Sequence, residues 1–364
     1  MARSAIVSGT AAPTGRRWAY AGCLLLATML GCAAELGDEG ALDQGETQEV
    51  GVVRQAMGAT ATVRSGLGDR TNVWNGNYGV WIKSGPDCKV TPFTVQRVKL
   101  SDGALQSTNL GCRPAVQAAV APNGTTHVWI GGSSGALSYH QILTVNGVGF
   151  TKRIDTDGSV HGMAATDTHI YWADDDGVKR MPSNGSSAEL LFSAEDTFVF
   201  GSEAVQTNVF GIDNGLVIFG AVVDSGTWLA IGEMWLDGAF PVEQFRMGGG
   251  TLAGLTWDDD NYYYAWKSGS IGSKSRWPGG GLTNLYNGPS GYTLEPGLAD
   301  SNGNLYFLRR SNATLKTDIL LRATNGIVAV QKLDVGTFYH DGLYVRSGNL
   351  FWSSNNGILK KASL

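Results

Sequence analysis

The sequence has little charge and no excess of positive charge. Only 16% of its 364 residues are Asp, Glu, Lys or Arg, and the formal net charge at pH 7 is −5. A chain that binds nucleic acid carries a basic stripe or patch, so this balance argues against a nucleic-acid partner. Low charge also argues against long amphipathic helices, because such helices need a polar, charged face.

Cysteine, histidine and proline are scarce, with 4, 5 and 10 copies. The chain also lacks the Walker loop of nucleotide-binding proteins and the His-Glu-x-x-His pair of zinc proteases. Glycine and aromatic residues are abundant instead, with 51 Gly, 11 Trp and 12 Tyr. This composition is typical of many short strands joined by tight turns.

The first residues have the pattern of a secretory signal. Arg16 and Arg17 precede an apolar run over residues 18–30, which is too short to span a bilayer comfortably. The run is followed by a Leu-Gly-Cys sequence that ends at Cys32 and resembles the lipobox of bacterial lipoproteins. The resemblance implies that Cys32 is acylated, and Ala33 after it fits sorting to the outer membrane of Gram-negative bacteria. The alternative is an ordinary signal peptide with an incidental cysteine.

The segment after Cys32 is acidic and contains no aromatic residue. Its acidic residues are Glu35, Asp38, Glu39, Asp43, Glu46 and Glu49. Low hydrophobicity with like charges predicts a flexible linker over residues 32–56. Residues 1–31 are then the signal peptide, and residues 57–364 form the folded domain. The lipid on Cys32 would hold this domain at the outer membrane, on either its periplasmic or its cell-surface side.

Cys88 and Cys112 are the cysteines of the folded domain. In an exported protein an even pair predicts a disulfide bond. Closing a loop of about 25 residues would contribute roughly 3 kcal/mol in the chain-entropy description. Two unpaired thiols are the alternative.

A repeat covers the chain from about residue 70 to its end. Its marker is an apolar or aromatic pair: Val80-Trp81, Val128-Trp129, Tyr171-Trp172, Val217-Ile218, Tyr263-Tyr264, Tyr306-Phe307 and Phe351-Trp352. The steps between second members are 48, 43, 46, 46, 43 and 45 residues. A following strand that ends in Asp-Gly or Asn-Gly recurs in register, and these pairs supply the positive φ of hairpins. Four short strands per 40 to 50 residues is the period of a β-propeller.

The sequence therefore predicts an all-β domain, a single β-propeller of seven four-stranded blades. The chain stops at Leu364, directly after the third strand of the last unit. The segment from Ala59 to Arg64 is strand-like and precedes the first unit. We expect it to supply the missing outer strand of the last blade, because this closes the ring and leaves no long exposed edge.

One unit carries a family resemblance. Residues Tyr171–Asp174, Tyr-Trp-Ala-Asp, are followed by Val178–Arg180 and resemble the Tyr-Trp-Thr-Asp repeat of low-density-lipoprotein-receptor propellers. Related extracellular propellers in bacterial lipoproteins are similar. Phe351–Ser354 is a partial copy. The receptor propellers have six blades, whereas the spacing here predicts seven.

A candidate site lies where the innermost strands begin, at the mouth of the central channel. The residues there are Gln117, His161, Thr207, Leu252, Glu295 and His340, with Asp341 beside the last. Two histidines and two carboxylates around one axis can bind a divalent metal or transfer protons. Seven-bladed antibiotic-ring lyases and six-bladed lactonases resemble this arrangement and use a divalent metal. The alternative is a wet channel lined by polar residues.

Other polar residues are given structural roles. His127, His140 and His169 are expected to be structural. The aspartate runs Asp174–Asp176 and Asp258–Asp260 are interpreted as solvated turn acids, because they lack the interleaved order and distant Glu of a calcium loop.

An aromatic cluster marks the fifth unit and includes Trp266 and Trp277. Exposed rings of this kind can stack on sugars or peptides, and packing between blades is the alternative. The primary hypothesis is a non-catalytic module, held at the envelope by its lipid, that binds a protein or a glycan without a cofactor. The alternative is a metal-dependent lyase or lactonase with its site at the channel mouth.

Overall fold

The computed structural model describes residues 60–364 except 69, 84–89, 135–136, 249–250, 278, 302–303, 315–316, 324–325, 333–339 and 355–356. The predicted signal peptide, the acidic linker and Cys32 lie outside the described residues. Helical structure in the described part is limited to α1 (Thr197–Phe200) and a 3-10 turn at Asp224–Gly226. Neither of these has the length or apolar content to cross a membrane.

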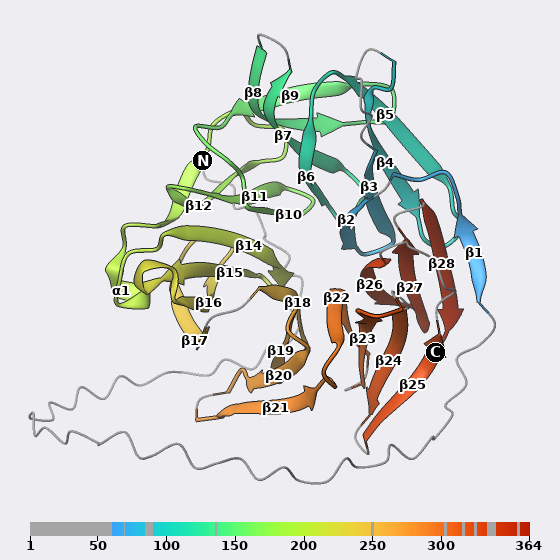
Figure 1. The fold of residues 1–364 in the computed structure, drawn as a ribbon. Coiled ribbons are helices and arrows are strands. Elements are labelled where there is room, and N and C mark those ends of the chain that lie inside the picture. The colour runs from blue at the N-terminus through green and yellow to red at the C-terminus, as the bar shows by residue number, and fades with distance from the viewer. Residues whose placement is uncertain are drawn as a thin grey trace, which may run out of the picture. The chain divides into compact units, whose positions relative to one another are not determined.

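The strands of the described residues pair antiparallel in seven four-stranded sheets, which are the blades of a ring (Figure 1). The predicted all-β, seven-bladed propeller is therefore confirmed. The first strands of neighbouring blades lie next to one another around the centre. They are β2 (Arg70–Asn75), β6 (Ala115–Val120), β10 (Gly162–Ala165), β14 (Gln206–Asp213), β18 (Leu252–Trp257), β22 (Tyr292–Ser301) and β26 (His340–Arg346).

The second strands contain the apolar or aromatic pairs that mark the repeat. They are β3 (Tyr78–Lys83), β7 (Thr126–Ser134), β11 (His169–Asp174), β15 (Leu216–Val223), β19 (Asn261–Trp266), β23 (Asn304–Ser311) and β27 (Asn349–Ser354). The third strands pair with them on the outer side. They are β4 (Phe93–Lys99), β8 (Leu137–Val145), β12 (Gly177–Pro182), β16 (Trp228–Trp235), β20 (Ser270–Ser275), β24 (Thr317–Ala323) and β28 (Ile358–Ser363).

The outer strands complete the blades. They are β5 (Leu105–Gly111), β9 (Phe150–Asp155), β13 (Glu189–Ser193), β17 (Val242–Gly248), β21 (Leu282–Asn287), β25 (Gly326–Lys332) and β1 (Ala61–Arg64). The last of these comes from the opposite end of the domain: β1 pairs with β28, in the order β1-β28-β27-β26. The predicted closure by the N-terminal strand is confirmed, and it covers the edge that β28 would otherwise expose.

The hydrophobic core lies in the seams between blades. Each of the clusters of buried apolar side chains takes its members from two neighbouring blades. The Tyr-Trp pair of the third blade shows how one strand serves two seams. Tyr171 packs with Phe219 of the fourth blade, and Trp172 packs with Trp129 of the second. Successive residues of a strand point to opposite sides, so an unbroken apolar pair can fill both seams.

His127 on β7 belongs to this interior. Its ring is fully buried, and its Nδ1 lies 2.9 Å from Thr144 Oγ1. Its Nε2 has no hydrogen-bond partner among the described residues. Burial, and then the positive charge of Arg153, lowers the pKa of His127 to about 4. The neutral imidazole is therefore a structural core group, as the sequence predicts.

Stability should fall on mild acidification because of this histidine. Its pKa is lower in the folded than in the unfolded chain, so unfolding takes up a proton between about pH 6.5 and pH 4. The contribution of the neutral His127 side chain to the free energy of unfolding is complete above pH 6.5 and is lost as the pH falls toward 4. When the pH is lowered from 7 to 4.5, the free energy of unfolding should fall by roughly 2–3 kcal/mol more in the native chain than in His127→Gln. Denaturant unfolding at both pH values measures this difference. Equal losses in both chains would contradict this account.

Candidate functional site

The two faces of the ring are built from different turns. Face A contains the segments that lead into the first strands and the turns between second and third strands. Face B contains the turns between first and second strands and between third and outer strands. The first strands surround the central channel, where ligands of propellers commonly bind, and the turns between third and outer strands lie toward the rim, so each predicted site residue can be assigned to a face.

His161 lies on face A, directly before β10. Its Nε2 is 2.8 Å from Oδ1 of Asp175, which belongs to the turn between β11 and β12. The imidazole is mostly buried, whereas the carboxylate is largely exposed. This hydrogen bond joins the start of the first strand to the hairpin of the same blade. It also makes an acid–base pair at the mouth of the channel.

Asp174, at the start of the same turn, is buried with only 3% of its side chain exposed. Its Oδ2 accepts a hydrogen bond from Trp172 Nε1 at 3.1 Å and pairs with Lys179 Nζ at 3.0 Å. Its Oδ1 accepts from the backbone N–H of Asp176. The interpretation of this aspartate run as solvated turn acids is therefore wrong for Asp174, although Asp175 and Asp176 are exposed. A buried carboxylate requires such partners, and here they come from its own blade.

Lys179 and Thr207 complete this arrangement. Thr207 on β14 of the fourth blade donates a hydrogen bond from Oγ1 to the carbonyl of Asp174 at 2.8 Å. Burial lowers the pKa of Lys179, but its hydrogen bonds and ion pairs with Asp176 and Asp174 raise it, and the net shift is upward. The ammonium group is therefore charged at neutral pH and holds the turn through its two ion pairs.

The turn is also shaped by Gly177, whose φ is 140°. A Cβ atom there would lie 1.9 Å from the carbonyl oxygen of Phe192, so only glycine fits beside strand β13. The Asp-Gly step of the repeat is thus required by close packing within the blade as well as by the hairpin.

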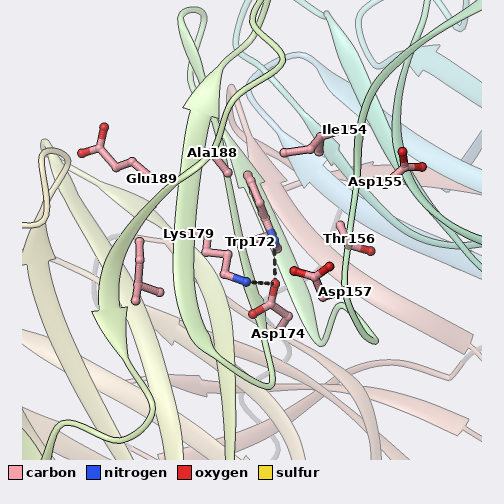
Figure 2. Close-up of a pocket in the computed structure, with 10 residues that line it drawn as sticks. Ile154, Asp155, Thr156, Asp157, Trp172, Asp174, Lys179, Ala188 and Glu189 are labelled. Carbon is pink, nitrogen blue, oxygen red and sulfur yellow. Dashed lines mark hydrogen bonds and ion pairs between the residues drawn. The ribbon is translucent and has the colours of Figure 1, made fainter.

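A pocket of about 260 Å³ lies beside this turn, between β9 of the second blade and the third blade. Figure 2 shows the side chains around it, with Asp157 and Asp174 at the same end. Its polar lining comprises Asp155, Thr156, Asp157, Asp174, Lys179 and Glu189. Asp174 and Lys179 are already bound to each other, and Asp155 is bound to Lys152. These charges are mostly compensated within the protein.

Among the described side chains, the remaining channel-mouth candidates form no metal-binding cluster with His161. Glu295 on β22 is buried and pairs with Arg310 on β23, with 3.3 Å between Oε1 and Nη1. Burial raises the pKa of Glu295 against the opposing effects of Arg310 and Lys267. Gln117 on β6 is half-buried, and Leu252 begins β18.

His340 and Asp341 begin β26, and their side chains lie outside the described part of the structure. Among the described residues, no three His, Cys, Asp or Glu side chains converge as a metal site would require. Cys112 lies directly after β5, on face A. Cys88 lies outside the described residues, so the disulfide bond stays a prediction.

Trp266 and Trp277 do not form one surface. Trp266 ends β19 on face A, where its ring packs against Tyr264 with 6.2 Å between centroids. Trp277 follows β20 on face B and is 64% exposed. Antiparallel pairing of β19 with β20 sets Asn261 opposite Ser275, so the two tryptophans lie at opposite ends of the blade.

The structure adds aromatic residues that the sequence analysis did not select. Trp235 ends β16 on face B and is about half exposed. Phe240, in the turn before β17, is 81% exposed and has a φ of 52°. One sequence signal could have found them, because Trp235 and Phe240 flank the Asp237-Gly238 turn. The alternation of inward and outward side chains ends at such a turn, so aromatic residues there need not be buried.

Comparison with known proteins supports the fold. No family model and no curated protein matches the chain. The Cps50 (Swd1) β-propeller domain of Myceliophteria thermophila is 10% identical, with a TM-score of 0.56 over 85% of this chain and 99% of that chain. Virginiamycin B lyase from Staphylococcus aureus is 14% identical, with a TM-score of 0.55 over 84% and 99%. YCF48 from Cyanidioschyzon merolae is 12% identical, with a TM-score of 0.54 over 84% and 98%. These similarities define the class as a β-propeller.

The buried aspartate gives a matched pair of variants. Asp174→Asn leaves the Lys179 ammonium with a weaker buried partner, so the free energy of unfolding should fall by about 2–4 kcal/mol. Asp176→Asn removes an exposed partner of the same lysine and should cost less than about 1 kcal/mol. Asp176 is 62% exposed, which makes it the control. Equal effects of the two changes in denaturant unfolding would show that burial of Asp174 does not matter.

Proposed function

We propose that the protein is a non-catalytic binding module that recognises a protein partner at the bacterial cell envelope, where a lipid on Cys32 holds it. The observation that carries the proposal is the exposure of Trp235, Phe240 and Trp277 on short turns of face B. The blades of a propeller already bury their aromatic residues in the seams. Large aromatic side chains left outside are therefore available to a partner, and such residues dominate the energetics of protein interfaces.

The turn between β16 and β17 supports the proposal because its shape is set by its own hydrogen bonds. The N–H of Gly238 donates to the carbonyl of Trp235 at 2.8 Å, and the N–H of Trp235 donates to the carbonyl of Ala239 at 3.0 Å. The side chain of Asp237 accepts from the N–H of Ala239 at 3.0 Å. A preformed turn loses little conformational entropy on binding, which favours affinity.

The lipid tether rests on the sequence. The lipobox-like residues before Cys32 and the acidic linker after it fit a domain that is exported and held at a short distance from the outer membrane. Acylation, export and the side of the membrane belong to the proposal together with the binding role.

The proposal predicts a protein neighbour on face B in living cells. A photo-crosslinking amino acid in place of Phe240 should capture an envelope protein, because this side chain projects from the exposed turn. The same substitution at Phe198 is the matched control, since this phenylalanine is 91% exposed on face A. The Cys32→Ala chain should leave the membrane fraction and lose the crosslink. Absence of a specific crosslink at Phe240, or an equally strong crosslink at Phe198, would overturn the proposed function.

The alternative function is a metal-dependent lyase or lactonase with its site at the mouth of the channel. The His161–Asp175 pair and the fold similarity to virginiamycin B lyase favour it. His161, Glu295 and His340 would be its ligands or its acid–base groups. The binding-module proposal predicts no stoichiometric divalent metal in chain purified without chelator. Near one equivalent of metal, lost in His161→Ala, would reject the binding module in favour of the enzyme.

A further inference from the structure

We infer that face B of the fourth and fifth blades is a docking surface for a positively charged, Lys- or Arg-containing segment of a partner protein. We call it the acidic-aromatic surface. It comprises the exposed rings of Trp235, Phe240 and Trp277 and the exposed carboxylates of Asp237, Asp259 and Asp260. The inference rests on the proposed function and specifies the chemistry of the partner.

Phe240 is the most unusual residue of this surface. A bulky side chain rarely adopts positive φ, because its Cβ crowds the backbone, yet Phe240 has a φ of 52° and projects into solvent. Neither burial nor backbone preference accounts for an exposed phenylalanine in this conformation. Strained backbone of this kind concentrates at functional sites. A contact made by the ring with a partner is a physical reason for the arrangement.

The two turns that carry the rings are joined by a network centred on Arg276. Its Nη1 lies 2.5 Å from Asp213 Oδ2, and its Nη2 lies 2.5 Å from Glu233 Oε1. Glu233 also accepts a hydrogen bond from the hydroxyl of Tyr262. Arg276 directly precedes Trp277, and Glu233 lies two residues before Trp235 at the end of β16, so the network ties together the strand ends that lead into the two turns. The aromatic rings are thus displayed from a fixed platform.

The exposed charge of the surface is negative. Arg276 is neutralised by its two carboxylates, and Lys274, which keeps its charge while it donates to the carbonyl of Gly280, is outnumbered by the exposed Asp237, Asp259 and Asp260. Asp260 accepts a hydrogen bond from Trp277 Nε1 at 3.0 Å, which places a carboxylate at the edge of an exposed indole. A carboxylate can accept several hydrogen bonds, so each retains capacity for a partner.

Rings interleaved with carboxylates match Lys and Arg side chains. The cationic head can lie over an aromatic face and donate hydrogen bonds to a neighbouring carboxylate, while its methylene stem covers the ring. A neutral sugar would use the rings and leave the carboxylates without a positive partner. The charge of the surface therefore favours a basic peptide over a glycan.

A pocket lies beside the acidic-aromatic surface. This pocket of about 420 Å³ between the third and fourth blades is lined by Trp235 and Asp237, together with Thr168, His169 and Tyr171. Arg180, which also lines it, is bound to Glu189 and to the carbonyl of Leu236. A long side chain of the partner can enter this pocket while its neighbours lie across the rings.

The test uses two fluorescent dodecapeptides, one of alternating arginine and alanine and the other of alternating glutamate and alanine. Their anisotropy is titrated with the full chain in nonionic detergent. The arginine peptide should bind at low salt and more weakly as salt rises, whereas the glutamate peptide should not bind. Asp237→Asn and Phe240→Ala should each weaken binding about fivefold, the loss expected for one charge or cation–π contact.

The chain offers close controls. Asp102 lies in the corresponding turn of the first blade, where its Oδ1 accepts from the N–H of Ala104 as Asp237 accepts from Ala239. Asp102→Asn and Phe198→Ala should leave binding unchanged, and all variants should melt within a few degrees of the native chain. Equal binding by every variant, or no binding of the arginine peptide, would overturn the inference. Binding of a neutral oligosaccharide that is lost in Phe240→Ala, without peptide binding, would also overturn it.

The outcome separates the inference from the proposed function. If peptide binding fails while the Phe240 position still crosslinks an envelope protein and the Phe198 position does not, only the chemistry assigned to the partner is wrong. If peptide binding fails and the Phe240 position does not crosslink a protein, both the inference and the binding-module function are rejected.

Discussion

The structure depends on burial of the second strands from both sides. Tyr171 and Trp172 are consecutive, so they point into different seams and tie the third blade to the fourth and to the second. A single blade cannot cover these surfaces by itself, because one side of each sheet would remain in water. In the ring, each blade has a neighbour on both sides and buries both surfaces. Strand β1 completes the ring by pairing with β28, which joins the two ends of the domain. Closure follows from the same burial that forms each seam.

This constraint also governs the polar groups. A charge that enters a seam must bring its partners, as Arg276 does with Asp213 and Glu233 between the fourth and fifth blades. Asp174 and Lys179 follow the same rule within the third blade. Buried charge in this protein therefore contributes to the scaffold. Exposed aromatic side chains lie on the turns, so we place the proposed binding function on the faces of the ring.

The fold could be predicted because its signals are local and repeated. The apolar or aromatic pair and the Asp-Gly turns recur at one period, and the final unit keeps the same register. A strand that is weakly marked in one blade can therefore be assigned from its equivalents in the others. The candidate site lacked such redundancy. Glu295 was expected at an open channel mouth, yet it is buried against Arg310. Trp266 and Trp277 seemed one cluster by sequence distance, but the hairpin between them sets them on opposite faces.

By itself, the sequence determined the strand period, the number of blades and the strand that closes the ring, because alternation, turn residues and repeat spacing act over short distances along the chain. Only the tertiary structure decided which polar groups form hydrogen bonds and ion pairs within the protein and which aromatic rings remain exposed. His161 meets Asp175 through hairpin geometry, and Arg276 is neutralised by residues of the preceding blade. Phe240 is left in solvent even though Leu191 of the third blade packs beside Gly238 in the same turn. Exposure depends on what packs against a residue, and those partners come from distant parts of the chain.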